Sequence, residues 1–180
     1  MATSTLLQYL ESTDAVTGAS LGLTPSDRLK VETFLFTNTN AVGGANITLT
    51  AKQLAALDVT KMATDTTGGT TALFVTTADY NAATVQKIVV GCFAETITVV
   101  PQQTVKVKVV VRGPVLSVPA VGAIAQGDPV ILDPAGAAGS CAAQGAYNLA
   151  SGNLVSEAFG FALTAAAAGV VNVYVLNKGI

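Results

Sequence analysis

Short runs of β-branched residues, separated by turn residues, recur along most of this 180-residue chain. The clearest run is TVKVKVVV at 104–111, in which valine occupies every second position and Lys106 and Lys108 lie between the valines. Because successive side chains of a strand point to opposite faces, this alternation predicts a half-buried β-strand. Gly113 and Pro114 are predicted to end it. Similar runs predict further strands at 29–36, 72–77, 86–94, 96–100, 114–120, 127–133, 153–163 and 170–176.

Many short strands with frequent turns indicate an all-β protein, built as a small β-barrel or sandwich. One exception is AKQLAALDVTKM at 51–62, which predicts a short helix. Residues 1–28 are mixed in character and are predicted to form an extended N-terminal arm. The remaining chain is predicted to form two related β repeats, at 29–112 and 113–180.

The two predicted repeats are based on three matches that occur in the same order in both halves. GGANITL matches QGDPVIL, VVGCFA matches AFGFAL, and each half closes with an alternating strand. These matches pair Gly44 with Gly127 and Gly91 with Gly160. Glycine in or beside a strand indicates a kink, or a close approach of a neighbouring backbone, so these four glycines are predicted to be structural.

Composition excludes several classes of function. The chain has no histidine, so Ser-His-Asp and Cys-His catalysis and imidazole zinc sites are excluded. Its nine Lys and Arg residues and net charge of −2 do not provide the basic surface that nucleic acid requires. No apolar run is long enough to predict a membrane span. The first residues lack the basic region of a signal peptide, so synthesis in a host cytoplasm is expected.

The remaining residues with reactive side chains do not form a recognisable motif. Cys92 and Cys141 lie 49 positions apart, without a CxxC pair, and are predicted to be buried thiols. The acidic residues are isolated, and Asp128 and Asp133, which precede prolines, are predicted to be turn residues. The glycine pairs at 43–44 and 68–69 lack the Gly-Lys-Ser/Thr of a phosphate-binding loop. The sequence therefore predicts no catalytic residue, no cofactor and no metal site.

Charged residues make up 11% of the chain, against about 25% in ordinary soluble domains. Interfaces are depleted of charged side chains at their centres, because desolvating an unpaired charge costs several kcal/mol. A surface covered by other subunits explains this composition. The alternative is an isolated β domain whose surface is rich in Thr, Ser and Asn.

GDPVILD, a loop of small residues, FGFAL, an Ala-rich turn and VVNVYVL follow one another in residues 118–178. This succession resembles the capsid decoration (cement, or head-stabilising) proteins of tailed bacteriophages, in the group with repeated β-tulip or barrel-like units. The residues that carry the resemblance are Gly127, Asp128, Gly160, Ala162, Leu163, Gly169, Val171, Val173 and Val175. Residues 31–112 fit the pattern less well, since Cys92 and Phe93 stand where the second half has Phe161 and Ala162.

The resemblance implies a tulip-like fold without enzymatic activity and a homo-oligomer, often a trimer. It also implies a place on the capsid exterior of a virion, with the major capsid protein as partner. An apolar cluster in the arm, outside both repeats, is predicted to anchor the arm on the shell and to become ordered only there. The cluster consists of Leu6, Leu7, Tyr9 and Leu10.

Three other functions remain open at this stage. A head fibre, tail or minor shell component is a second structural role in a virion. A carbohydrate-binding β module needs exposed aromatic rings, for which Tyr80 and Tyr147 are the candidates. An enzyme with carboxylate or lysine chemistry is the least favoured.

Overall fold

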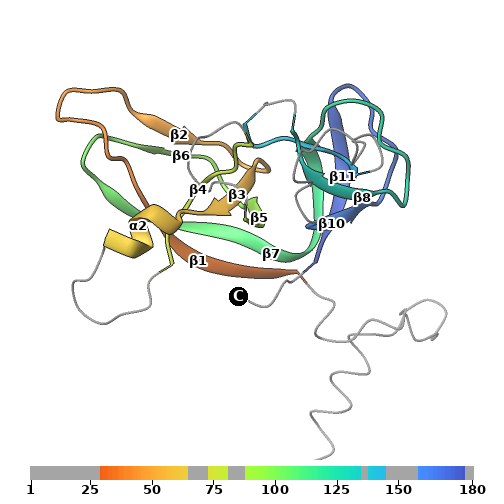
Figure 1. Cartoon of the computed structure of the whole chain (residues 1–180), viewed down its shortest axis with the longest axis horizontal. Coiled ribbons are helices and arrows are strands. Elements are labelled where there is room, and N and C mark those ends of the chain that lie inside the picture. The colour runs from red at the N-terminus through yellow and green to blue at the C-terminus, as the bar shows by residue number, and fades with distance from the viewer. Residues whose placement is uncertain (1–28, 65–72, 81–87, 135–137, 145–157, 177–180) are drawn as a thin grey trace, which may run out of the picture.

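The computed structural model describes residues 29–64, 73–80, 88–134, 138–144 and 158–176, and within these ranges it is an all-β protein (Figure 1). Within the same ranges no helix is long and apolar enough to cross a membrane. The elements are β1 (Lys30–Thr37), β2 (Ile47–Leu49), β3 (Leu54–Leu57), α2 (Val59–Thr64), β4 (Val75–Thr77), β5 (Val89–Phe93), β6 (Ile97–Val99), β7 (Thr104–Pro119), β8 (Pro129–Leu132), β9 (Cys141–Ala143), β10 (Gly160–Ala162) and β11 (Val170–Val175).

The 16-residue strand β7 connects the two halves of the fold (Figure 1). Its first part pairs antiparallel with β1 and β5, and its second part pairs antiparallel with β11. The large sheet has the order β4-β3-β5-β7-β11-β10-β8-β9, with β1 also paired to β7, while β2 and β6 form a separate two-stranded sheet. The predicted strand at 104–111 is therefore confirmed, but it is shorter than the observed one.

The prediction that Gly113 and Pro114 end this strand is wrong, because β7 continues to Pro119. Pro114 lacks an N–H but lies opposite Tyr174 in the register with β11. The carbonyl oxygen of Tyr174 faces Gly160 of β10, on the other side of β11. The Tyr174 carbonyl oxygen therefore points away from β7 and does not need an N–H donor from Pro114. No hydrogen bond between β7 and β11 is lost at this position, so the strand tolerates the proline.

The predicted helix at 51–62 is also wrong over most of its length. The structure has β3 at Leu54–Leu57, and the helix α2 begins only at Val59. β3 lies between β4 and β5, and its residues Leu54, Ala55 and Ala56 are all fully buried. A strand buried on both faces is apolar at every position, and such a run cannot be distinguished from a buried helix by its periodicity.

Two hydrophobic cores lie on opposite faces of the central strands. Residues of β5 reach both cores, since Val90 and Phe93 belong to one core and Val89 and Cys92 to the other. The division does not follow strict alternation, because the pairing of β5 with β3 has a register shift between Ala55 and Ala56. The first core consists of Phe34, Phe36, Leu49, Ala55, Val75, Val90, Phe93, Val99, Val107, Val109 and Val111. The second core includes Leu54, Ala56, Val89, Cys92, Val110, Val115, Val118, Val130, Leu132, Cys141, Phe159, Val171 and Val173. The second core thus joins residues from both predicted repeats.

The two halves share one order of strand pairing. In the first half the order is β4-β3-β5-β7-β1, and in the second it is β9-β8-β10-β11-β7. Each half also has an isolated parallel bridge, Leu35 to Phe74 in the first and Ala120 to Cys141 in the second. The predicted boundary at 112/113 falls inside β7, which contributes to both halves. A duplication of the sequence remains a prediction.

Asn38, which follows β1, is fully buried and connects three segments of the first half. Its side-chain nitrogen donates hydrogen bonds to the carbonyl oxygens of Val99, at 2.9 Å, and Ala45, at 3.2 Å. Its side-chain oxygen accepts one from the N–H of Asn40 at 3.0 Å. Its backbone N–H donates to the carbonyl oxygen of Gln103 at 3.0 Å. The side chain thus satisfies polar backbone groups that the loops around β2 and β6 leave without strand partners.

Candidate functional site

A row of four side chains crosses the outer face of the second half. The register between strands places Pro129 of β8 opposite Phe161 of β10, Phe161 opposite Tyr174 of β11, and Tyr174 opposite Pro114 of β7. The neighbours of the two aromatic residues along their own strands, including Gly160, Ala162, Val173 and Val175, are buried. Because strand residues alternate between faces, the row points away from the second core. We call these four residues the aromatic row.

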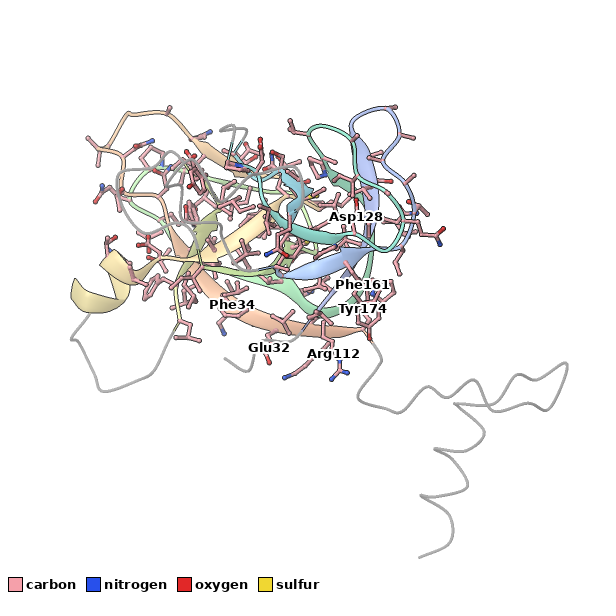
Figure 2. All side chains as sticks on the ribbon, turned by 45° about the vertical axis from the view of Figure 1, so that its right-hand side comes forward. Glu32, Phe34, Arg112, Asp128, Phe161 and Tyr174 are labelled. Carbon is pink, nitrogen blue, oxygen red and sulfur yellow. The ribbon has the colours of Figure 1, made fainter. Side chains whose placement is uncertain are left out.

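The two aromatic rings at the centre of the row stack on each other (Figure 2). The ring centroids of Phe161 and Tyr174 are 5.3 Å apart, and the ring planes are inclined by 13°. Directly opposite residues on neighbouring antiparallel strands have Cβ atoms about 4.5–5.5 Å apart, which is the spacing that such a pair needs. Phe161 remains 37% exposed. The pair therefore presents a large apolar surface to the exterior of the chain.

Further exposed apolar side chains lie on or next to two strands of the row, β7 and β11. Leu116 of β7 is 60% exposed, and Leu176 and Val170 at the two ends of β11 are also exposed. We call the aromatic row and these three residues the apolar face. None of its seven residues carries a charge, whereas Lys106 and Lys108 are exposed on the first part of β7.

A polar contact between β7 and β11 lies within the apolar face, next to Leu116. Ser117 adopts a left-handed conformation with φ of +57°, at a register shift between β7 and β11. The side-chain oxygen of Asn172 accepts a hydrogen bond of 3.0 Å from the N–H of Ser117. An extra residue that is bonded in this way is typical of a β-bulge, which turns the following side chains.

No family model and no curated protein matches this chain.

The four predicted structural glycines have different surroundings. Gly91 in β5 faces the carbonyl oxygen of Val110 in β7, and Gly160 in β10 faces that of Tyr174 in β11, in both cases too close for a Cβ atom. β5 and β10 also hold the same place in the pairing order of their halves. In contrast, Gly44 precedes β2 in the small sheet, while Gly127 precedes β8 in the large sheet and has φ of +89°. The structure thus places Gly91 and Gly160 equivalently, and Gly44 and Gly127 differently.

Other residues singled out in the sequence lie away from the apolar face or outside the described residues. The arm cluster of Leu6, Leu7, Tyr9 and Leu10 lies outside the described residues, as does Tyr147. Tyr80 is half-buried against the second core. Asp128 accepts a hydrogen bond from the N–H of Ala125, which is consistent with a turn. Within the described ranges, His, Cys, Asp and Glu do not gather into a group of three that could hold a metal ion.

Sequence reasoning did not identify the aromatic row. The alternation in VVNVYVL predicts that Tyr174 points away from the valine face, so its outward direction could be predicted from the sequence. The partners of Tyr174 depend on the register of three other strands, which local sequence does not determine. The sequence placed Pro114 and Pro129 within predicted strands, at 114–120 and 127–133, and gave neither a role on an exposed face.

The burial of Asp133 is a second feature that the sequence did not predict. This residue is almost fully buried. Its carboxylate accepts a hydrogen bond from the Ser140 hydroxyl at 3.2 Å. Its backbone N–H also donates to the carbonyl oxygen of Ser140, at 3.1 Å. The pair bridges the chain between β8 and β9, next to Cys141. A structural role explains these bonds.

Both cysteines are free and buried, as predicted. Burial raises the pKa of the Cys92 thiol well above its ordinary value, and negative charge on Cys141 would raise it further. Burial also raises the pKa of Cys141 to about 12, an effect that its own backbone hydrogen bond opposes and the nearby Asp133 reinforces. Because the thiolate is the reactive form, neither residue is suited to nucleophilic or redox chemistry.

These raised pKa values predict that stability falls at alkaline pH. A thiol with a higher pKa in the folded state stabilises the fold fully below the unfolded pKa of about 9, and this contribution is lost as pH rises towards the folded pKa. Each buried thiol should therefore lower the free energy of unfolding by about 1.4 kcal/mol for each pH unit above about pH 9.5. Urea denaturation of wild type and a Cys92→Ala/Cys141→Ala variant, at pH 8, 10 and 11, measures the difference. Equal pH dependence in the two proteins would contradict the prediction.

Proposed function

We propose that this protein is a non-enzymatic structural component of a bacteriophage virion, which binds the outer surface of the capsid shell and stabilises it. The observation that carries the proposal is the apolar face, with its stacked Phe161–Tyr174 pair, on a chain of low charge content. Contiguous exposed apolar surface marks interaction sites in soluble proteins. Interface centres are enriched in aromatic residues and depleted of charged ones. The resemblance of residues 118–178 to capsid decoration proteins supplies the identity of the partner.

The resemblance region and the apolar face overlap. Pro129, Phe161, Val170, Tyr174 and Leu176 all lie between residues 118 and 178. The partners in this proposal are the major capsid protein and further copies of the same chain, with a trimer favoured. The arm supplies additional contacts with the shell through its apolar cluster.

Stabilisation follows from mass action. A protein that binds the assembled lattice, and not its dissociated subunits, shifts the equilibrium towards the intact shell by RT ln(1 + [L]/Kd). Several copies joined in one oligomer engage neighbouring lattice sites together, which multiplies a modest affinity at each site. No bond is made or broken in this mechanism, so it requires no catalytic residue or cofactor.

Co-sedimentation with empty shells assembled from the cognate major capsid protein tests the proposal. Wild type should pellet with shells, and a Phe161→Ser/Leu116→Ser variant should bind at least about tenfold more weakly, since burying each large apolar side chain contributes about 1.5–3 kcal/mol. Val42→Ser is the matched control, because Val42 is 88% exposed in the connection between β1 and β2, away from the apolar face. Light scattering of the free protein gives its oligomeric state. A monomer that ignores the shells would overturn the proposal.

The Phe161–Tyr174 pair also favours a second candidate, a carbohydrate-binding β module. Sugars stack on the open faces of aromatic rings, and here each ring turns one face to the other ring. The register partners Pro129 and Pro114 lie on the outer sides of this pair of residues. This arrangement gives less support to a sugar site than to a protein interface. A glycan array without binding would exclude it, and imaging of particles separates a head-surface position from a tail or fibre.

A further inference from the structure

The described chain begins beside the apolar face. Gly113, which precedes Pro114 of the aromatic row, has φ of +110°, and an added Cβ there would lie 2.9 Å from the Cα atom of Leu29. Residues 1–28 therefore join the described fold at the end of the aromatic row. Figure 2 shows Arg112, the residue before Gly113, on the same side as Phe161 and Tyr174.

The arm has the composition to cover such a surface. Its apolar cluster, Leu6 to Leu10, has no charged residue, and the first charge in the arm is Glu11. The apolar face also has no charged residue. Contact between the two would thus remove apolar surface from water on both sides without desolvating an unpaired charge.

The distances allow the contact within one chain. Leu10 and Leu29 are 19 positions apart, and a chain of that length without fixed structure has a root-mean-square end-to-end distance of about 25 Å. The aromatic row crosses four strands spaced about 4.8 Å apart, so it extends over roughly 15 Å. The cluster can therefore reach every residue of the row.

We propose that in the free protein the apolar cluster of the arm, Leu6, Leu7, Tyr9 and Leu10, packs on the apolar face of its own chain. The tether favours the same chain over a second copy, because a short linker produces an effective concentration in the millimolar range. That exceeds the micromolar concentrations at which a purified protein is studied. The inference concerns the free protein and does not depend on capsid binding. It replaces the expectation that the arm becomes ordered only on the shell, and a shell that binds the same face would have to displace the arm.

Disulfide trapping in the full-length chain tests the contact. A Leu10→Cys/Leu116→Cys variant, treated with a mild oxidant, should form a disulfide within one chain, detected by mobility without reductant and by mass spectrometry of the linked peptides. The native Cys92 and Cys141 are buried and do not compete. The control pair is Leu10→Cys/Val42→Cys, since the connection between β1 and β2 lies at the opposite end of the fold from β8, β10 and β11 (Figure 1). The first pair should cross-link at least about tenfold faster.

Equal rates for the two pairs, or disulfides mainly between two chains, would overturn the proposal. A second measurement needs no added cysteine. Chymotrypsin should cut after Tyr9 at least about tenfold faster in the Phe161→Ser/Leu116→Ser variant than in wild type, because the arm would lose its docking surface. Val42→Ser should match wild type. An unchanged cutting rate in the face variant would also overturn the proposal.

Discussion

Gly91→Ala is expected to prevent the chain from reaching its native fold at ordinary temperature. A Cβ atom at this position would lie well inside 3.0 Å of the Val110 carbonyl oxygen and 2.9 Å from Cγ1 of Val109. The closest obstacle is backbone, which cannot move aside by a change of rotamer. Relief requires β5 to separate from β7, in the layer between the two cores. We expect a loss of at least about 4 kcal/mol, comparable with the whole stability of many domains.

Gly127→Ala is the matched control for this substitution. An added Cβ at Gly127 has no atom within 4 Å, so its cost comes from the positive φ of +89° alone. That cost is about 1–2 kcal/mol for an L-residue in the left-handed region. Circular dichroism and urea denaturation of both variants measure the difference. Gly160→Ala, which faces the carbonyl oxygen of Tyr174, should behave like Gly91→Ala. Similar stabilities for Gly91→Ala and Gly127→Ala would contradict the close approach of β5 and β7.

Asn38→Asp should be the most damaging single-atom exchange in the described part of the first half. The Asn38 side-chain nitrogen donates to two carbonyl oxygens, and a carboxylate oxygen in its place would face two acceptors without a proton. Breaking such a buried network costs about 3–5 kcal/mol when a charge is left uncompensated. Burial and the two carbonyls would raise the pKa of the new carboxyl, because both disfavour its ionised form.

The pH dependence of this variant has a definite sign. A carboxyl with a raised folded-state pKa is tolerated best below its unfolded pKa of about 3.9, and the variant loses stability as pH rises through the folded value. Asn38→Asp should therefore be closer to wild type at pH 4 than at pH 7 in urea denaturation. Asn40→Asp makes the same exchange at a half-buried residue that donates to Ala45, and should cost less. A variant as stable as wild type at pH 7 would show that Asn38 is not buried as described.

Both predictions concern the first half and the central layer, whereas the functional proposals concern the apolar face of the second half. The Phe161→Ser and Leu116→Ser substitutions remove exposed side chains and should leave the fold intact. The two groups of variants thus separate effects on folding from effects on binding. If a variant of the apolar face unfolds, these side chains contribute to the stability of the fold and not only to binding.

The fold class and most strand positions could be predicted because they depend on local alternation. The valine alternation in β7 and β11 and the short runs at β1, β5 and β8 each correspond to an observed strand. The errors have specific causes. Leu54–Leu57 is apolar at every position because both of its faces are buried, so its period is lost. Pro114 is compatible with β7 only because of where the Tyr174 carbonyl points.

The candidate site depends even more than the fold on contacts between distant parts of the chain, which local sequence patterns do not determine. The outward direction of Tyr174 could be predicted from its own strand, but its stacking with Phe161 depends on the pairing of β10 with β11. The arm cluster was recognised in the sequence, and its proposed docking on the apolar face is argued from the closeness of Leu29 to Gly113. Neither relation lies within the span of residues that a local pattern covers.

The amino-acid sequence by itself determined the β class of this protein, its low charge, the burial of its two thiols and the exclusion of histidine chemistry. These properties follow from residue types and short-range periodicity, which act over one strand at a time. Tertiary structure alone decided that β7 joins both halves, that two cores share the central strands, and that four residues from four strands form the aromatic row. The reason is that register and layer order are set by side chains far apart in the chain, which meet only after the strands have paired.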